Sequence, residues 1–434
     1  MVAAAIRLVR KEEGAAARRP EILMSLERVY NANSLYNGFM KSKEGVQWKE
    51  SVQKYETNLL LNIYTTQKEL KNGTYKTKPM TEFLLCERGH TRHIKAQHIR
   101  DRVVQRSLND NVLIPKVRPK LIHDNGASLK GKGLAFSRRR FEVHLRKAYK
   151  EYGGDACILL MDFRKYYDNV QHEKAFELYA PLLDEEEMNF LKFCFKDFEA
   201  DVSYMADEEY ATSMGKVFDA LKHAEIPQKL KTGTKFLKKS LGIGNQSAQV
   251  TGIFYPNRID QYCKTVKRIK YYGRYMDDTY IILPDKQELK KVYEEIKEIC
   301  ADMGIFINEK KSHIRKITGW LTWLKINYKL KPTGGLIRKV HSSTIRRERR
   351  RLKKLVKLYQ AGRMTEEKIR ECFDSWRGCY RKYDSMAKLN QLEKYLNQLL
   401  KEANNGRTDQ TNDARTGNLQ SRSSPHTQCG NRRL

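Results

Sequence analysis

Two adjacent carboxylates, Asp277 and Asp278, stand between runs rich in Tyr and Ile in the segment IKYYGRYMDDTYIIL. This pattern predicts a strand, a tight turn and a second strand, with both acids at the turn. Apolar strands do not normally carry two unneutralised acids at their tip, and hard divalent cations bind carboxylate oxygens. A bound cation would explain the pair, although this segment alone is equally consistent with a plain hairpin whose acidic turn is solvated.

A third carboxylate, Asp162, closes a short apolar run in DACILLMDFRKYYDNV, and this segment predicts a strand followed by a helix. If that strand lies in one sheet with the hairpin, Asp162, Asp277 and Asp278 could together hold two magnesium ions. Magnesium suits such a site because it binds through few carboxylates and through substrate phosphates. A two-metal site stabilises the attacking and the leaving oxygens of an in-line phosphoryl transfer.

The chain is strongly basic, with a formal net charge of +32 over 434 residues. Such an excess opposes compaction and is relieved when a polyanion neutralises it, which predicts a nucleic-acid partner. General basicity without such a partner remains the alternative. The basic segment HTRHIKAQHIRDRVVQ carries Arg92, Lys95 and Arg102, which could neutralise the triphosphate of a nucleotide as it departs.

Other patterns exclude several classes of site. The eight cysteines form no CxxC pair and no HExxH occurs, so neither a zinc site nor a disulfide framework is indicated. Cysteines in apolar stretches are typical of core thiols in a reducing, cytoplasmic setting. No run has the length of a membrane span, and no signal-peptide pattern opens the chain. We therefore expect a cytoplasmic protein without a membrane partner.

Segments spread over about residues 90–330 resemble, in order, the motifs of reverse transcriptases, and specifically of bacterial and phage ones. HTRHIKAQHIRDRVVQ resembles the fingers segment, LLMDFRKYYDNVQH the first palm motif and LGIGNQSAQ the motif that supports template and primer. YMDD is the signature of the family, INEKKSHI resembles the following palm motif with Asn308 and Lys311, and GWLTWLKI resembles the primer grip. The resemblance implies an α+β fold, a right-hand polymerase with fingers, an antiparallel-sheet palm and a helical thumb.

The resemblance also implies roles for single residues. Asp162, Asp277 and Asp278 would bind two Mg²⁺ ions, for which Mn²⁺ could substitute, and Lys311 would donate a proton to the leaving pyrophosphate, unless it is an ordinary exposed lysine. Tyr167 would pack under the sugar of the incoming nucleotide and exclude a 2′-hydroxyl, unless it is only a core aromatic. The implied substrate-binding set is Arg92, Lys95, Arg102, Phe163, Tyr167, Gly244, Asn245 and Gln249.

The template motif narrows the resemblance. Most members of the family have Pro-Gln-Gly there, whereas this chain has Gly242-Ile243-Gly244-Asn245. This version resembles the enzymes of diversity-generating retroelements and related unassigned groups, some linked to phage defence, although Ala248 stands where Ser is expected. Such a relationship implies an RNA template and a DNA product or primer. A cognate structured RNA or a small accessory protein would be a further partner.

Periodicity and composition predict the domain boundaries. We expect residues 24 to about 85 to be mostly helical, and the strand GIFINEKKSHI to follow the helix KQELKKVYEEIKEICADM. The stretch TGWLTWLKINYKLKPTGG predicts a further hairpin. The thumb would be three helices, the first with a basic face formed by Arg349, Arg350, Lys353 and Lys354. The predicted order is a flexible extension over 1–23, a helical region with fingers over 24–160 and a palm over 161–338, which contains an inserted helical segment at about 173–238. A thumb over 339–402 and a disordered tail over 403–434 follow.

These observations favour an RNA-directed DNA polymerase, but two alternatives stay open. The chain could be an RNA-binding assembly protein whose polymerase activity is weak or depends on a partner. The three intact aspartates argue against an inactive enzyme. RNA synthesis by a related palm polymerase is the other alternative, and Tyr167 argues against it because an RNA polymerase needs room for the 2′-hydroxyl.

Overall fold

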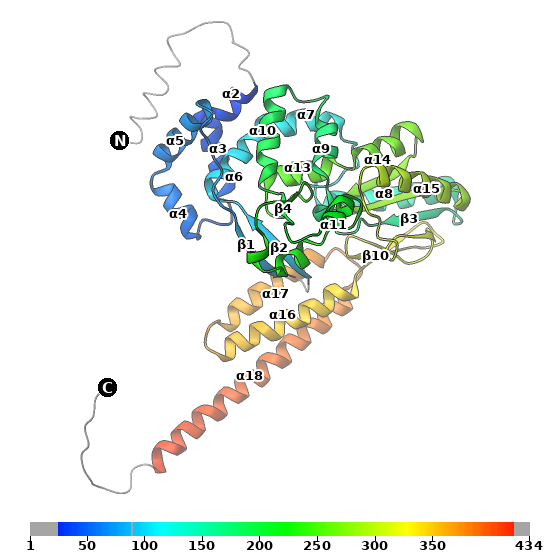
Figure 1. Cartoon of the computed structure of the whole chain (residues 1–434). Coiled ribbons are helices and arrows are strands. Elements are labelled where there is room, and N and C mark those ends of the chain that lie inside the picture. The colour runs from blue at the N-terminus through cyan, green and yellow to red at the C-terminus, as the bar shows by residue number, and fades with distance from the viewer. Residues whose placement is uncertain (1–24, 88–89, 421–434) are drawn as a thin grey trace, which may run out of the picture. The chain divides into compact units, whose positions relative to one another are not determined.

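The computed structural model describes residues 25–87 and 90–420, which form a mixture of helices and antiparallel sheets (Figure 1). The expected α+β class is thereby confirmed. The described chain divides into two compact units that alternate in sequence. The first unit takes the residues up to Arg140 and those from Ala156 to Arg315, and the second takes Phe141–Asp155 and the residues from Lys316 onward. The extension expected over 1–23 and the last part of the expected tail, 421–434, lie outside the described residues.

The first unit is built on a four-stranded sheet with the strand order β6-β7-β3-β8. Its strands are β3 (Cys157–Met161), β6 (Tyr271–Tyr275), β7 (Asp278–Leu283) and β8 (His313–Lys316). Strand β7 pairs antiparallel with both β6 and β3, and Met161 lies opposite Thr279. Every residue of β3 is buried, which explains why its sequence CILLM is a continuous apolar run without alternation. The predicted hairpin around the two adjacent acids is confirmed.

Several helices supply apolar side chains to the main core of this unit. Among them are α13 (Gln246–Phe254), α14 (Asn257–Gln261) and α15 (Lys286–Asp302). Helix α15 lies against β3 (Figure 1) and also contacts β7. Helix α15 buries Leu289, Val292, Ile296 and Cys300, at helical spacings of three and four, beside Leu159 of the sheet. The helix expected over KQELKKVYEEIKEICADM is confirmed.

The N-terminal part of the first unit has a second core, formed by Leu35, Phe39, Ile63 and Val103 with their neighbours. The helices of this N-terminal part are α2 (Ser25–Tyr30), α3 (Ala32–Ser42), α4 (Glu50–Thr57), α5 (Leu59–Lys71), α6 (Ile99–Leu108), the π-helix η1 (Asn109–Leu113), α7 (Ile114–Val117) and the 3-10 helix η2 (Arg118–Lys120).

The helical prediction for residues up to about 85 is wrong after Lys71. Strand β1 (Thr81–Glu87) instead pairs with β2 (His90–Ala96) as an antiparallel hairpin, because TEFLLCE gains the ladder of hydrogen bonds that a short apolar segment needs.

The segment between the sheet strands β3 and β6 is mainly helical, as expected. It contains the 3-10 helix η3 (Tyr166–Asn169), α9 (His172–Tyr179), α10 (Glu185–Lys196), α11 (Asp207–Thr212), η4 (Ser213–Gly215), α12 (Ala220–Glu225), η5 (Gln228–Leu230) and, after α14, the π-helix η6 (Tyr262–Val266). The sequence did not predict one feature of this segment, a pair of two-residue strands, β4 (Ala200–Asp201) and β5 (Phe236–Leu237). This pair closes a small core that includes Val202 and Phe218.

The second unit combines a three-stranded sheet with three helices. The elements are β9 (Leu321–Trp323), β10 (Ile326–Leu330), β11 (Leu336–Val340), α16 (Ser342–Gln360), α17 (Glu366–Tyr380) and α18 (Met386–Gln420), while the boundary between the units falls inside α8 (Leu134–Tyr152). The predicted hairpin and the three predicted helices are confirmed. The disordered tail expected from residue 403 is wrong as far as Gln420, because helix α18 continues past Glu402. Ala403 is buried in the helical core, and the Tyr359 hydroxyl donates a hydrogen bond to Asn404 Oδ1 over 2.6 Å.

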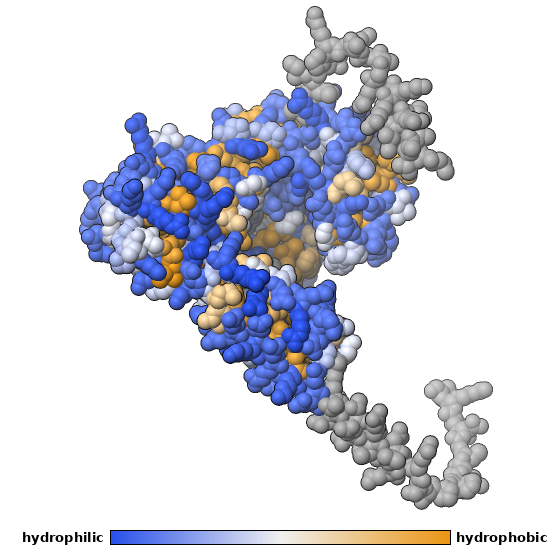
Figure 2. Space-filling view, turned by 180° about the vertical axis from the view of Figure 1, so that it is seen from behind, coloured by the Kyte–Doolittle hydropathy of each residue, from blue (hydrophilic) through white to orange (hydrophobic). Residues whose placement is uncertain are grey.

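The surface agrees with the composition. Figure 2 shows a face that is mostly hydrophilic, with apolar residues confined to scattered patches. Within residues 25–87 and 90–420, no helix combines the length and the apolar character needed to cross a membrane.

Candidate active site

The turn between β6 and β7 is as tight as a hairpin allows. Tyr275 lies opposite Asp278, so Met276 and Asp277 alone form the loop. Two-residue hairpins require a positive φ, and Met276 has φ 57°. A non-glycine residue in this region is under backbone strain of about 1 kcal/mol or more. The sequence therefore places a strained residue directly before the first of the two adjacent acids.

The sheet brings Asp162 to the same end as this turn. Asp162 directly follows Met161, whose partner Thr279 directly follows Asp278. Burial, and then the nearby charge of Asp162, raise the pKa of Asp277 to about 6. The carboxylates that are far apart in sequence thus interact electrostatically in the fold.

Asp162 is held by the turn that follows α15. The backbone N–H of Asn308 donates to the Asp162 carbonyl over 2.8 Å, and Asn308 Nδ2 donates to Oδ2 over 2.9 Å. Lys311 Nζ lies 3.0 Å from Asp162 Oδ2. The strand predicted over GIFINEKKSHI is wrong for most of its length, because the N–H groups of Lys311 and Ser312 donate to the Asn308 carbonyl and close a turn. Strand β8 begins only at His313.

The three aspartates fit a hard divalent cation by their chemistry. Their donors are carboxylate oxygens, which Mg²⁺ and Mn²⁺ accept. Burial is the main cause of the raised pKa of Asp277, and the negative charge of Asp162 adds to it. Across the described ranges, no three or more His, Cys, Asp or Glu side chains are already gathered as a metal cluster. Asp162, Asp277 and Asp278 supply carboxylate oxygens near this end of the sheet, but among the described residues they do not form such a cluster.

Tyr167 lies between the turn and α13. Its hydroxyl is 3.7 Å from Met276 Sδ, and a Cβ atom added at Gly252 would lie only 2.8 Å from the same hydroxyl oxygen. Burial is the main cause that raises the pKa of Tyr167, followed by the charge of Asp277. Phe163, also predicted to bind substrate, is buried, and its ring packs against Tyr166 with the centroids 5.6 Å apart.

The predicted template motif lies beside the hairpin of β1 and β2. Ile243 forms a parallel bridge with Ile94 of β2, and Gly242 and Gly244 both have positive φ, 60° and 125°. Asn245 is buried, yet neither of its side-chain amide atoms has a hydrogen-bond partner among the described residues. Buried amides are normally paired, so Asn245 stands out as a candidate ligand contact. Gly244 and Gln249 are exposed.

The three predicted triphosphate contacts are not brought together. Arg92 is exposed; burial is the main cause that raises the pKa of Asp277, and the charge of Arg92, the smallest of the influences on this carboxyl, opposes that rise. Lys95 instead reaches the Glu199 carbonyl at 3.5 Å, and burial lowers its pKa. Arg102 donates to the Ser42 carbonyl over 3.3 Å, which links α6 to α3. Arg92 is therefore the one of the three with an interaction at the acidic turn.

Two features beside the turn were missed from the sequence, and the first of them is a buried ion pair. Arg274 and Asp260 are completely buried and form an ion pair, with Nη2 2.6 Å from Oδ2. The signal was available, because an arginine inside the apolar strand YYGRY must have a buried partner.

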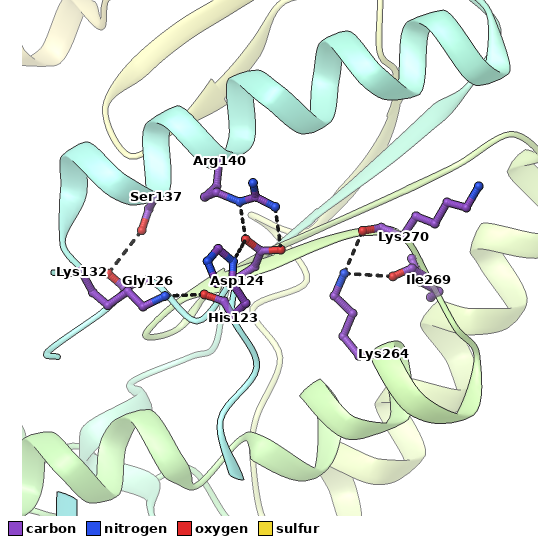
Figure 3. Close-up of polar contacts among 9 residues, drawn as sticks. All are labelled: His123, Asp124, Gly126, Lys132, Ser137, Arg140, Lys264, Ile269 and Lys270. Carbon is purple, nitrogen blue, oxygen red and sulfur yellow. Dashed lines mark hydrogen bonds and ion pairs between the residues drawn. The ribbon is translucent and has the colours of Figure 1, made fainter. Parts of the chain in front are cut away.

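The second feature is a set of backbone hydrogen bonds between β6 and the loop that contains Asp124 and Gly126. The Arg274 N–H donates to the Asp124 carbonyl over 3.1 Å, and the Gly126 N–H donates to the Arg274 carbonyl over 2.8 Å. Figure 3 shows how this loop is fixed: Arg140 donates to the Asp124 carboxylate, and the Ser137 hydroxyl to the Gly126 carbonyl. A Cβ atom at Gly126 would lie 1.8 Å from Ser137 Oγ, so this close approach requires glycine.

Helix α16 of the second unit presents the predicted basic face. Its buried side comprises Thr344, Glu348, Leu352 and Val356, so that the intervening cations face outward. The exposed members are Arg349, Arg350, Lys353 and Lys354. Their exposure leaves them accessible to a polyanion.

Comparison with known proteins gives the family. The family described as reverse transcriptase (RNA-dependent DNA polymerase) matches residues 76–328. No curated protein matches the chain. Among solved structures, the chain is similar to telomerase from Candida albicans in complex with a TWJ fragment of telomeric RNA, at 10% sequence identity and a TM-score of 0.40. The similarity covers 65% of this chain and 50% of that chain, so this chain spans half the length of that telomerase chain. Because the family match covers more than half of the 434 residues, the chain belongs to the reverse transcriptase family of nucleotidyltransferases.

Proposed function

We propose that the chain is an RNA-directed DNA polymerase that extends a primer with deoxynucleotides on an RNA template by two-metal-ion nucleotidyl transfer. The observation that carries the proposal is the pairing of β3 with β7, which leaves Asp162 beside the strand that begins at Asp278. The family match supports the same activity. When bound, two Mg²⁺ ions would stabilise the attacking and leaving oxygens.

The chain's own residues would do the remaining work. Asp162, Asp277 and Asp278 would bind the ions, and Arg92 would neutralise triphosphate charge. Lys311, whose side chain is 66% exposed, could donate a proton to the departing pyrophosphate after leaving Asp162. Phe163 and Tyr167 would form the floor under the sugar, and Gly244, Asn245 and Gln249 would contact template or primer.

The direct test uses the purified full chain. We expect it to incorporate dNTPs on a primed RNA template, to require both template and Mg²⁺ or Mn²⁺, and to make DNA complementary to the template. Incorporation of NTPs in preference to dNTPs would favour RNA synthesis instead. Tight RNA binding without incorporation would favour an assembly role that needs a partner for polymerisation.

The basic face of α16 is proposed to bind the primed template. Replacing all four exposed cations of this face by Gln, which keeps helix propensity, should weaken binding. The slope of the logarithm of the binding constant against the logarithm of the salt concentration should become shallower by about 3, because fewer counterions are released. Fluorescence anisotropy at several salt concentrations measures both quantities. The substituted residues are Arg349, Arg350, Lys353 and Lys354.

A matched variant separates position from total charge. It removes four exposed cations from the other two helices of the same unit, Lys368, Lys388, Lys394 and Lys401, again by Gln. We expect its salt slope to stay close to that of the wild type. An equal slope for both variants would mean that the α16 face acts only through net charge.

The biological setting is proposed from the template motif. LGIGNQSAQ resembles the motifs of retroelement and phage-defence enzymes, and the free cysteines Cys157, Cys194, Cys263 and Cys300 are buried, which suits a cytoplasmic location. A cognate structured RNA or a small accessory protein would then be the partner. Sequencing the RNA that copurifies with the protein tests this: one enriched structured RNA supports the setting, whereas bulk cellular RNA opposes it.

A further inference from the structure

The largest fully buried side chain in the described structure belongs to a cation, Arg274, two residues before Met276. Arg274 Nε donates to Asp260 Oδ1 over 2.8 Å and Nη2 to Oδ2 over 2.6 Å, so the pair is bidentate. The Tyr272 hydroxyl donates to the same carboxylate over 2.5 Å. A buried ion pair is weak evidence for stability by itself, because desolvation offsets the attraction. Its presence therefore calls for a specific role.

The remaining donors of Arg274 show what that role would be. Nη1 donates to the Met276 carbonyl over 3.1 Å, and Nη2 also donates to the Ile253 carbonyl over 2.7 Å. Asp260 lies in α14 and Ile253 in α13. A single guanidinium thus joins two core helices to the backbone of the two-residue loop.

The backbone of Arg274 is fixed as well. Its N–H and C=O groups bond to Asp124 and Gly126, and a parallel bridge joins Arg274 to Asn125. Asn125 Nδ2 donates to the Ile253 carbonyl over 3.1 Å, the same acceptor that Arg274 uses. Both sides of β6 are therefore held just before the turn begins.

We propose that Arg274, anchored by Asp260, is a positioning residue that holds the Met276–Asp277 turn in the conformation that presents Asp277. This inference rests on the proposed polymerase function. The strained φ of Met276 supports it, because strained backbone persists only where the surroundings fix it. Lysine cannot take over the role, since one ammonium group lacks the planar fork that reaches several fixed acceptors.

The kinetic test is Arg274→Lys, which keeps a cation beside Asp260 but loses the fork. We expect kcat for dNTP incorporation to fall about a hundredfold, the size of effect that misplacement of a reacting group produces. The KM for dNTP and the affinity for primed template should stay within about twofold of the wild type, because the turn matters in the transition state. Assays are run well below the melting temperature of the variant.

The matched control is Arg258→Lys, in the same helix as Asp260. Arg258 pairs with Asp302, and both side chains are 53% exposed, so this pair has the same chemistry but no contact with the turn. We expect its kcat to equal that of the wild type. A kcat for Arg274→Lys that also equals the wild-type value would overturn the proposal.

A spectroscopic readout separates positioning from general packing and does not depend on activity. In protein labelled with ¹³C at methionine methyl groups, the Met276 signal, assigned by its loss in Met276→Leu, reports the turn. We expect Arg274→Lys and Asp260→Asn each to shift this signal while that of the buried core residue Met303 stays in place.

Two outcomes of the methyl spectra would contradict the inference. If the signals of Met276 and Met303 both broaden together with a lower melting temperature, Arg274 only stabilises the core. If none of them moves, the turn does not depend on Arg274. Should the wild type incorporate no nucleotide at all, the proposed function fails, whereas the methyl comparison still decides whether Arg274 positions the turn.

Discussion

Replacement of Asp277 by Asn is expected to abolish DNA synthesis while the protein stays folded. The amide has nearly the same volume as the carboxylate but no charge with which to bind a divalent cation. Loss of about 4 kcal/mol of transition-state stabilisation corresponds to roughly a thousandfold in rate. We expect the same loss for Asp162→Asn. Primer extension on an RNA template measures the effect.

The melting temperature of Asp277→Asn provides the folding check. The pKa of Asp277 is raised by burial and by Asp162, so ionising this carboxyl costs more free energy in the metal-free fold than in the unfolded chain. A neutral amide removes that cost, and the melting temperature without metal should therefore stay level or rise. The control is Asp302→Asn at the exposed end of α15, which should keep full activity. Undiminished synthesis by Asp277→Asn would remove the carboxylate from the mechanism.

Replacement of Tyr167 by Ala is expected to reduce the discrimination between dNTPs and NTPs about a hundredfold, which corresponds to a steric block of about 3 kcal/mol. If the ring lies beneath the incoming sugar, it occupies the volume that a 2′-hydroxyl needs. Truncation should raise the efficiency with ATP and lower that with dATP, because a packing surface is lost. The measurement is kcat/KM for dATP and ATP on one RNA template.

Tyr167→Phe is the matched control for this experiment. It keeps the ring but loses the hydroxyl that contacts Met276 Sδ, so discrimination should be retained. If Tyr167→Ala lowers both efficiencies equally, the residue is a packing element between the turn and α13. The RNA-synthesis alternative would then gain ground.

The sequence predicted the elements whose signal is local. The hairpin around Asp277, helix α15 and the three helices after His341 follow from periodicity and from turn residues that act over a few positions. The turn at Asn308 was missed because it depends on Asp162, which accepts hydrogen bonds from Asn308 and attracts Lys311 across the fold. An isolated reading of INEKKSHI contains no trace of that partner.

In the candidate site, too, the sequence identified residues by local motifs but could not show the contacts that form across the fold. Motif order selected the three aspartates and Tyr167, but side-chain direction could not be read from it. Lys95 and Arg102 stand in a basic segment, yet their side chains reach carbonyl groups at Glu199 and Ser42. The sequence indicates that Arg274 needs a buried partner but not which one, because Asp260 lies on a helix and only the packing of that helix on the sheet makes the pair.

The division of α8 between two units has a consequence for synthesis on the ribosome. Phe141, in the part of α8 that belongs to the second unit, stacks on Trp323 with the centroids 5.4 Å apart and packs against Tyr328 at 5.0 Å. Because translation is vectorial, this aromatic face of α8 emerges long before its partners exist, and such transiently exposed apolar surface favours aggregation. The core of the second unit can therefore be completed only after the strands that follow Lys316 have emerged. Contacts of such long range slow folding.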